Sequence, residues 1–420
     1  MKNSLLSLRW LVFIVLMLVP PLVLVARSAG NLCFYILIFL SLITIICRLR
    51  PTNKYFFQLL KDYWPLHLAM AGMLLAIFAN QLLSQNLVIK TYDYPSRMAL
   101  FFLILWVALF CPFQLMRNMQ WAYVTGALFS AVKMYLITKG GTSRAYVDFM
   151  PIIEFAQLTL LLGFFSLLSI GYAESNPIIR RVGLVLKLIA ACASIYAAYL
   201  SQTRGAWIGI PIFLVISVFI LYKNVHFSKQ IAAVAVLVIM LGVLFGSTHI
   251  VQERIAVAGQ DMSEYASNAN VDTSVGIRLQ LWKGSLLLFS RNPVVGVGRE
   301  GFDAALGDLE KEGVLTHEAA VQPHSHNEIL YNMATLGLFG LIGILSLYFV
   351  PAYYFFRQVS HPDKEVRITA GMGLILCAGF FILGLVDVMF MWGTSDNFYG
   401  LFMAIFFAYI IKRKETLAVE

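Results

Sequence analysis

The sequence predicts an all-α polytopic membrane protein, and its composition and the layout of its apolar runs lead to that fold class. Of 420 residues, 60% are hydrophobic and 13% are charged, whereas soluble domains carry roughly 45–50% apolar and about 25% charged residues. The apolar residues form runs close to the ~20 residues that a helix needs to cross a bilayer. These runs are continuous and do not alternate with polar residues. They therefore predict helices, which satisfy their own backbone hydrogen bonds in lipid.

We expect about 12 transmembrane helices, placed by windowed hydropathy. Their approximate ranges are 10–26, 32–47, 66–84, 98–113, 121–138, 152–173, 184–201, 205–222, 230–248, 326–356, 367–388 and 395–411. The chain then divides into three parts. Residues 1–248 hold spans one to nine, residues 249–325 form one large loop domain with an amphipathic helix, and residues 326–420 hold the last three spans and a short tail.

The basic residues predict the orientation of these spans. A net charge of +9 would suggest nucleic acid for a soluble protein, but here Lys and Arg beside anionic membrane lipid explain it. Most of them fall in loops on one side, including Arg48, Arg50, Arg180, Arg181 and Arg357. We therefore expect both termini inside, the 249–325 loop outside, membrane lipid as a partner and no nucleic acid.

The loop of residues 249–325 is too long to be a passive connector, and long loops are usually functional. Residues 276–290 predict an amphipathic helix that ends before Pro293. Gly296, Gly298 and Gly301 follow in a turn-rich segment. We expect the chemistry of the protein at this loop.

A histidine-rich segment, Pro323-His324-Ser325-His326-Asn327-Glu328, ends the loop. The S-x-x-E spacing before an apolar run is that of a capping box, which predicts Ser325 as N-cap and His326 in the first helical turn. A helix N-terminus favours the neutral imidazole that a general base needs, and it can also receive phosphate. The alternative is a histidine pair at the membrane interface without chemistry. We favour His326 and His324 as catalytic residues.

Arginines stand out in two other segments on the same side. Arg204, in the turn Ser201-Gln202-Thr203-Arg204-Gly205, runs against the positive-inside trend. It either snorkels to the headgroups or clamps phosphate with its planar fork. Arg278 and Trp282 share one face of the 276–290 helix. That helix either rests on the membrane surface or offers a second cation to a diphosphate, and Arg299 is a further candidate.

Asp387 falls within the eleventh expected span, 367–388. A carboxylate inside a membrane is a functional candidate by default, although it could instead pair with an Arg or His as structure.

We expect no metal and no other cofactor. The five cysteines show no C-x-x-C spacing, and His317, His324 and His326 match no strong zinc pattern. The sequence also lacks a D-x-D pair, a Walker-type loop, a G-x-S-x-G elbow and an H-E-x-x-H motif.

Together these segments resemble the O-antigen ligase and polymerase superfamily. The resemblance rests on Gln202-Thr203-Arg204, on Arg278 with Trp282, on Asn292-Pro293 to Gly298, and on His324-Ser325-His326-Asn327-Glu328 followed by Leu336-Gly337-Leu338-Phe339-Gly340. It extends from about the seventh span to the eleventh. The first six spans match only in hydrophobicity.

The resemblance implies a metal-independent, inverting glycosyltransferase of the bacterial inner membrane whose site faces the periplasm. It implies an undecaprenyl-pyrophosphate-linked glycan as donor. By the same resemblance, His326 is the essential histidine, His324 a second one, and Arg204 and Arg278 the essential arginines. The remaining substrate-binding candidates are Trp282, Arg299, Asn327 and Asp387.

The acceptor divides the superfamily. An O-antigen ligase transfers the polysaccharide to lipid A–core, a polymerase extends one lipid-linked repeat with another, and a protein O-oligosaccharyltransferase modifies proteins. The chain shows one large outer loop and ends soon after its last span, so we expect the ligase. A transporter for a lipid-linked glycan stays as the alternative from another class, and Asp387 is the residue that it would use.

Overall fold

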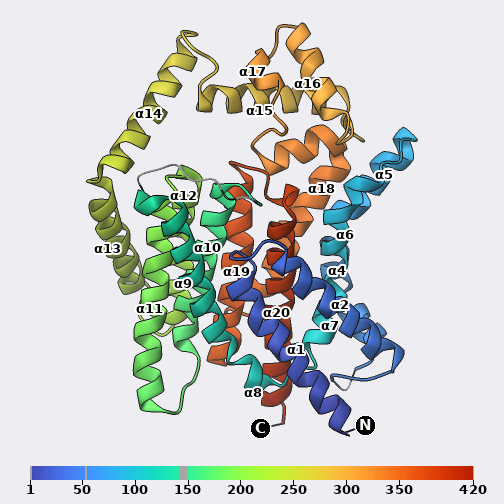
Figure 1. The fold of residues 1–420 in the computed structure, drawn as a ribbon, viewed down its shortest axis with the longest axis vertical. Coiled ribbons are helices and arrows are strands. Elements are labelled where there is room, and N and C mark those ends of the chain that lie inside the picture. The colour runs from blue at the N-terminus through green and yellow to red at the C-terminus, as the bar shows by residue number, and fades with distance from the viewer. Residues whose placement is uncertain (1, 53, 142–146, 148, 420) are drawn as a thin grey trace.

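The computed structural model describes residues 2–52, 54–141, 147 and 149–419. Within these ranges the fold consists of helices and short turns, with one isolated β-bridge between Val147 and Met150. The predicted all-α class is confirmed. The long apolar helices stand side by side as a bundle, and a smaller group of helices covers one of its ends (Figure 1).

The long and medium-length helices of the bundle follow one another along the chain, and some of them are joined end to end by bends. They are α1 (Lys2–Leu22), α2 (Ala29–Ile46), α4 (Trp64–Met70), α5 (Gly72–Ser84), α6 (Asp93–Ala99), α7 (Phe101–Ala108), α9 (Met119–Ile137), α10 (Ile152–Leu168), α11 (Pro177–Leu200), α12 (Arg204–Leu221), α13 (Phe227–Gly246), α18 (Glu328–Phe356), α19 (Lys364–Gly384) and α20 (Gly393–Leu417). Two short helices, α3 (Phe56–Asp62) and α8 (Phe113–Met116), connect them.

The expected number of spans is not confirmed. By length and composition, seven of the described helices can cross a membrane, or nine if each bent pair forms one span. The α4–α5 pair bends by 57°, and the chain from Ile89 to Ile137 bends by 118°. Two more apolar helices, Leu6–Leu22 and Phe227–Val243, are shorter. The chain is thus a multi-pass membrane protein, but hydropathy windows cannot show where an apolar run breaks.

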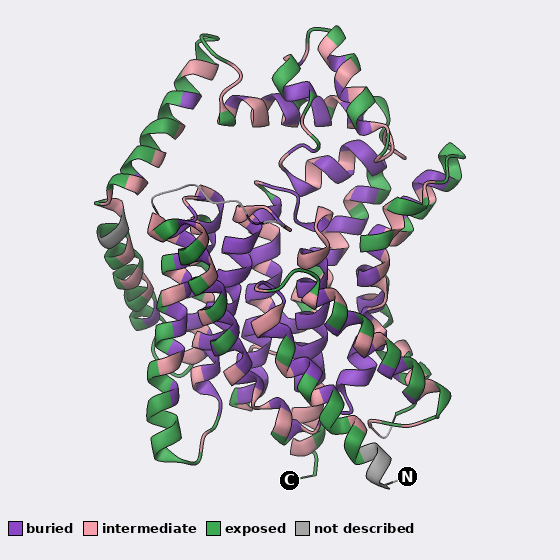
Figure 2. Ribbon diagram, in the orientation of Figure 1, coloured by how far each residue is buried: buried purple, intermediate pink, exposed green. Residues whose placement is uncertain are grey.

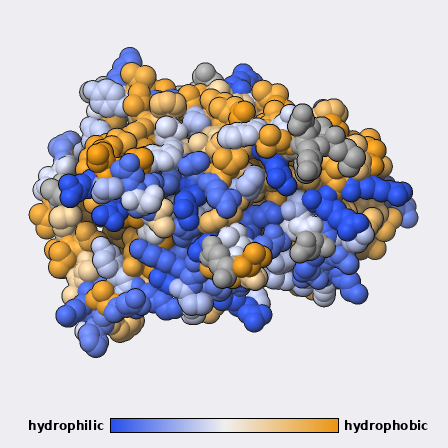
Figure 3. Space-filling view, turned by 90° about the horizontal axis from the view of Figure 1, so that it is seen from below, coloured by the Kyte–Doolittle hydropathy of each residue, from blue (hydrophilic) through white to orange (hydrophobic). Residues whose placement is uncertain are grey.

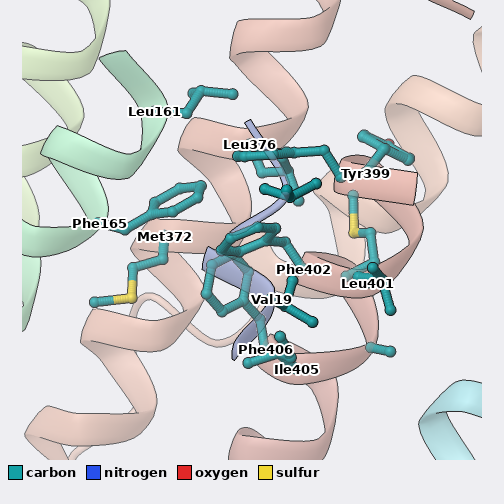
Figure 4. Packing of buried hydrophobic residues seen from close by; sticks show 14 of the residues in the cluster. Val19, Leu161, Phe165, Met372, Leu376, Tyr399, Leu401, Phe402, Ile405 and Phe406 are labelled. Carbon is teal, nitrogen blue, oxygen red and sulfur yellow. The ribbon is translucent and has the colours of Figure 1, made fainter. Parts of the chain in front are cut away.

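Helices α10, α19 and α20 form the centre of the bundle, because their apolar windows are 83%, 83% and 89% buried, against 39% for α2 and α11 (Figure 2). Aromatic side chains fill this centre, where the Phe165 ring lies edge-on to Phe406 at 5.0 Å and tilted to Phe402 at 5.4 Å (Figure 4). In lipid, such close packing holds helices together, because lipid tails are as apolar as the side chains.

Both termini lie at one end of the bundle, and the loop domain of residues 249–325 lies at the other (Figure 1). Seen from the end with the termini, hydrophilic side chains occupy the middle of the face and apolar side chains gather along much of its margin (Figure 3). This is the pattern of a water-facing end surrounded by a lipid-facing belt. The predicted separation of termini and long loop therefore agrees with the fold.

The loop domain is built from four helices, α14 (His249–Ala266), α15 (Ser274–Arg291), α16 (Phe302–Lys311) and α17 (His317–Ala320). Thr273 caps α15 by accepting a hydrogen bond from the Gly276 amide. The apolar face of α15, with Leu281 and Leu288, packs on α16 and α17 and forms a small core within the loop domain. The helix predicted over 276–290 is confirmed, whereas the other three helices were not predicted.

A break in α18 fixes the loop domain to the bundle. At Gly337 the backbone turns to φ 61° and ψ −143°. The Leu338 amide, freed from the helical ladder, donates to the Pro293 carbonyl at 2.8 Å, and the Ala334 and Thr335 carbonyls accept from the Val297 and Gly298 amides. The predicted glycine-rich segment is thus a backbone clasp (residues 293–298 on the break in α18).

We predict that Gly296→Ala and Gly337→Ala each destabilise the protein by at least about 2 kcal/mol. Both glycines have positive φ, which costs an alanine roughly 1–2 kcal/mol. A Cβ would also lie 2.4 Å from backbone atoms of Thr335 or Val294. Thermal unfolding of the purified protein in detergent measures the effect.

Gly307→Ala is the matched control, because Gly307 lies inside α16 and a Cβ there meets no atom within 4 Å. It should be neutral or should stabilise by up to about 1 kcal/mol, as alanine replaces glycine in a helix. Equal melting temperatures for all three variants would show that the clasp does not hold the domain.

Candidate active site

Two segments distant in sequence meet between the loop domain and the bundle. One is residues 321–327, which lead into α18, and the other follows α19. Asn327 joins them, because its side-chain oxygen accepts from the Leu330 amide at 3.0 Å while its Nδ2 donates to the Leu385 carbonyl at 3.1 Å. Asn327, and not Ser325, is therefore the N-cap of α18.

The expected capping box is wrong for a structural reason. The Ser325 hydroxyl donates to the Asn327 carbonyl at 2.9 Å, so it is not available to the helix amides. The Glu328 carboxylate does not reach back to Ser325, because it accepts hydrogen bonds from Asn332 Nδ2 and from the Phe390 amide. His326 consequently lies just before the helix and not in its first turn.

His324, His326 and Asp387 form what we call the histidine–aspartate cluster. His326 Nδ1 lies 3.4 Å and His324 Nε2 lies 3.8 Å from Asp387 Oδ1. The two imidazole rings meet edge to face, with centroids 4.4 Å apart. The sequence analysis placed Asp387 inside a span. However, α19 ends at Gly384, and the Asp387 amide bonds the Leu383 carbonyl as the chain turns.

His324 is a neutral member of the cluster. The His326 amide donates to its Nδ1 at 3.2 Å, which assigns the proton to Nε2, on the side of Asp387. Burial lowers the pKa of His324 to about 4, and the nearby His326 and Arg278 act in the same direction, outweighing Asp387.

Asp387 is the charged member. Burial alone would raise the pKa of Asp387, but His326 and His324 hold that pKa below its ordinary range. The Val388 amide also donates to Asp387 Oδ1 at 2.9 Å. An ionised carboxylate beside Nδ1 of His326 favours the tautomer with its proton on Nδ1, which leaves Nε2 as the basic nitrogen.

His326 is the accessible member. Its side chain is 24% exposed, against 9% for each of the other two. Its backbone has φ 48°, a left-handed conformation that is uncommon outside glycine. Such strain persists where surrounding contacts enforce it, and it clusters at functional sites. Of the two histidines, His326 is therefore the one placed to meet a substrate.

Arg278 and Trp282 project from α15 on one helical face. The charge of Arg278 reaches His324, because it helps to lower the pKa of that imidazole. The Trp282 indole nitrogen is shielded from solvent and has no hydrogen-bond partner in the described part of the chain. The structure therefore places Arg278 within electrostatic range of the cluster.

Arg204 begins α12, directly after a tight turn in which Gln202 has φ 54°. Its Nη1 donates to the Arg254 carbonyl at 3.3 Å, and Arg254 Nη2 donates to Gln202 Oε1 at 3.0 Å. Arg254, on α14, was not singled out from the sequence, because only a contact between helices brings it to Arg204. The two arginines lie together at one edge of the site.

Gly205 connects this edge to the cluster. A Cβ on Gly205 would lie 2.9 Å from Val386 Cγ2 and equally close to Ile153 Cδ1. The start of α12 thus packs directly on the neighbour of Asp387. Glu154, the next residue of α10, is fully buried, and its carboxylate oxygens have no hydrogen-bond partner among described residues.

Arg299 belongs to a separate network. Its Nη2 donates to Asn332 Oδ1 at 3.2 Å, and its guanidinium lies 5.9 Å from the Tyr331 ring centroid. Asn332 in turn donates to Glu328. These contacts hold the clasp segment on α18, so the geometry gives Arg299 a structural setting.

The three histidines considered as zinc ligands, His317, His324 and His326, do not come together as one set. His317 lies on α17, is 70% exposed and pairs with Glu310 at 3.0 Å. Instead, the ligand atoms of His324, His326 and Asp387 all lie within 4.8 Å of one another. Two imidazoles and a carboxylate are suitable metal ligands, so the cluster has a donor set that could hold an ion as well as move a proton.

Comparison with known proteins shows what the chain is similar to. Residues 189–345 match the O-antigen ligase family. An uncharacterized protein of Haemophilus influenzae is 24% identical over 290 residues, which cover 68% of this chain and 71% of that protein. The O-antigen ligase of Escherichia coli K12 is 28% identical over 251 residues, covering 57% of this chain and about half, 54%, of that protein.

These matches show that the chain is similar to O-antigen ligases, and its long apolar helices show a multi-pass membrane protein. The matched range contains Arg204, Arg254, Arg278, His324 and His326. The resemblance inferred from the sequence motifs is therefore confirmed at the level of the superfamily.

We predict that His324 makes the protein less stable as the pH falls below neutrality. Its pKa is about 4 when folded and near 6.5 otherwise, so between these values the unfolded chain binds more protons. The stabilisation present above pH 6.5 is lost toward pH 4 and amounts to at most about 3 kcal/mol, at about 1.4 kcal/mol per pKa unit. Melting temperatures at pH 7.5 and pH 5 should differ more for the wild type than for His324→Gln. Parallel losses in both proteins would contradict a buried neutral His324.

Proposed function

We propose that this protein is an O-antigen ligase that transfers undecaprenyl-pyrophosphate-linked O-antigen to lipid A–core in the synthesis of lipopolysaccharide. It would act in the bacterial inner membrane, with the loop domain and the site in the periplasm. The observation that carries the proposal is the histidine–aspartate cluster, with Arg278 beside it and with Arg204 and Arg254 at its edge. A base next to a cationic site is what transfer from a diphosphate donor needs.

In this reaction His326 is the general base. Its Nε2 takes the proton from an acceptor hydroxyl as that oxygen attacks the anomeric carbon of the donor. The bond from that carbon to the pyrophosphate oxygen breaks, and undecaprenyl pyrophosphate leaves with the electron pair. A single displacement of this kind inverts the anomeric centre. Asp387 is the positioning residue, because it orients His326 and stabilises the imidazolium that forms.

Arginines bind the diphosphate and stabilise the charge that grows on it. Arg204 and Arg278 were expected in this role, and the contact between Arg204 and Arg254 adds a third candidate. Guanidinium groups match phosphate oxygens with paired hydrogen bonds. Such preorganised charge is usually the largest electrostatic contribution to catalysis. We propose metal-independent chemistry on this basis, and treatment with EDTA tests it.

An apolar groove next to these arginines supports a lipid-linked donor. It has a volume of about 350 Å³ and lies among α11, α12, α13 and α14, with Tyr199, Trp207, Val251 and Ile255 in its wall. Val251 and Ile255 flank Arg254 on α14. A prenyl chain in this groove would place its diphosphate at Arg254 and Arg204. Trp282 and Asn327 then lie on the reactive side of the donor.

The purified protein should produce glycan-capped lipopolysaccharide from undecaprenyl-pyrophosphate O-antigen and rough lipopolysaccharide, in the presence of EDTA. His326→Ala should abolish the product, because no other group in the cluster has both the exposure and the basic nitrogen. Gel electrophoresis of the lipopolysaccharide measures the ladder. Longer lipid-linked glycan with unmodified lipopolysaccharide would show a polymerase, and glycosylated protein an oligosaccharyltransferase. Bound donor without any product would support a transporter.

His317→Ala is the matched control for this experiment. His317 belongs to the same loop domain, but it is exposed and pairs with Glu310 away from the cluster. Its loss should change the rate less than about twofold, as for most surface substitutions. A loss of activity with His317→Ala, or loss of the wild-type product with EDTA that added Zn²⁺ restores, would contradict the proposed mechanism.

We predict that Asp387→Asn lowers kcat at least about a hundredfold while KM for either substrate stays within a few-fold, because an amide no longer selects the productive tautomer. Initial rates with each substrate varied in turn separate the two constants. Asp387→Glu, which restores the charge, should recover part of the rate. A rise in KM without a fall in kcat would assign Asp387 to substrate binding.

A further inference from the structure

A second cavity lies on another side of the bundle from the apolar groove. It has a volume of about 570 Å³, within the usual range for ligand sites. Its wall includes Arg27, Asn31, Tyr94, Arg97, Trp392 and Asn397. Helices α2, α10 and α20 all begin at this wall, so the cavity lies toward the end of the bundle that carries the loop domain (Figure 1).

Polar side chains build the wall of the cavity. Arg97 is 7% exposed and holds Asp93 with two hydrogen bonds at 3.0 Å, while its Nη1 donates to Asn31 Oδ1 at 2.8 Å. Asn397 Nδ2 donates to the same Asn31 oxygen. This network pins α2, α6 and α20 together, so the wall is preorganised.

Two polar atoms of the wall remain unsatisfied. Asn397 is 1% exposed, and its Oδ1 has no hydrogen-bond partner among described residues. The Trp392 indole nitrogen is likewise shielded and without a partner there. One is an acceptor and the other a donor, and leaving such groups unpaired in a protein costs free energy. A ligand that pairs with both atoms must donate one hydrogen bond and accept another.

The chemistry of the wall selects the ligand. A hydroxyl group donates and accepts, so a polyhydroxylated ligand can meet both Asn397 and Trp392. A bare anion only accepts, and a lipid tail does neither. The Tyr94 ring, 5.1 Å from the Arg97 guanidinium, gives a flat surface for a sugar ring. Arg27 is exposed in this wall and adds a positive charge to it.

We propose that this cavity binds the saccharide of the acceptor, and that Arg27 recognises a phosphate or carboxylate group on that saccharide. The inference rests on the proposed function and extends it to the acceptor site. The arginines and apolar groove assigned to the donor lie at α11, α12 and α14, whereas this cavity lies at α2, α6 and α20 (Figure 1). Pro151 and Ile152 in its wall lead directly into Ile153 and Glu154, which lie beside the segment of Asp387.

The test measures binding without transfer. The full-length protein in nanodiscs is titrated with deacylated core oligosaccharide from rough lipopolysaccharide, either phosphorylated or treated with phosphatase. Arg27→Ala should weaken binding of the phosphorylated core about tenfold, the loss expected for one charge-assisted hydrogen bond. It should not change binding of the dephosphorylated core. Asn397→Ala should weaken binding of both.

Lys90→Ala is the matched control, because Lys90 is an exposed basic residue near α6 that does not line the cavity. It should bind both oligosaccharides like the wild type. Arg27 is exposed and its removal leaves the packing intact, so the result does not depend on whether Asn397→Ala folds. Unchanged binding by Arg27→Ala would overturn the inference.

Initial-rate kinetics separate this inference from the proposed reaction. If transfer occurs, Arg27→Ala should raise KM for the acceptor and leave KM for the lipid-linked donor unchanged. A rise in donor KM alone would assign the cavity to the donor glycan and overturn the acceptor assignment. If the wild type shows no transfer but Arg27→Ala loses binding of the core oligosaccharide, the cavity is an anionic-saccharide site and the proposed reaction is refuted. Transfer by Arg27→Ala with an unchanged KM for the acceptor would support the proposed reaction and refute the acceptor cavity.

Discussion

The candidate site depends on the two hydrogen bonds of one amide side chain. Asn327 caps α18 with its oxygen and holds the Leu385 carbonyl with its Nδ2. These bonds set the distance between the segment with the histidines and the segment with Asp387, which are about sixty residues apart in sequence. If either bond were lost, Asp387 would no longer be fixed relative to His326. Without a fixed Asp387, nothing in the cluster would select the tautomer of His326.

Two hydrogen bonds to neutral acceptors orient the arginines at the edge of this cluster. Arg204 donates to a backbone carbonyl, and Arg254 donates to the amide oxygen of Gln202. By contrast, Arg97 and Arg291 are paired with Asp93 and Glu312. Guanidinium groups bind phosphate oxygens with paired hydrogen bonds. In the proposed function, the two arginines that lie together at α12 and α14 would bind the diphosphate from one side.

Much of this could be predicted from the sequence, and the failures have a common cause. The fold class and the helix at 276–290 follow from local patterns, which a sequence contains, and the choice of His324 and His326 as candidates also came from such a pattern. The N-cap, the end of α19 before Asp387 and the exact number of spans depend on which neighbour meets each backbone group. The S-x-x-E spacing was present, but Ser325 and Glu328 found other partners in the folded chain. Arg254 and Glu154 gain their meaning only from contacts across helices.

The two recesses of the bundle make a physical case for a reaction with two large substrates. In the proposed function, the lipid-linked donor and the lipid-linked acceptor would each bring its own chains through the membrane. The apolar groove among α11 to α14 and the polar cavity at α2, α6 and α20 are differently lined and lie on different sides (Figure 1). The site lies beneath α15, and the clasp on Gly337 fixes that helix above it. A roof anchored by backbone hydrogen bonds keeps water, the competing acceptor, from the donor more effectively than a mobile loop would.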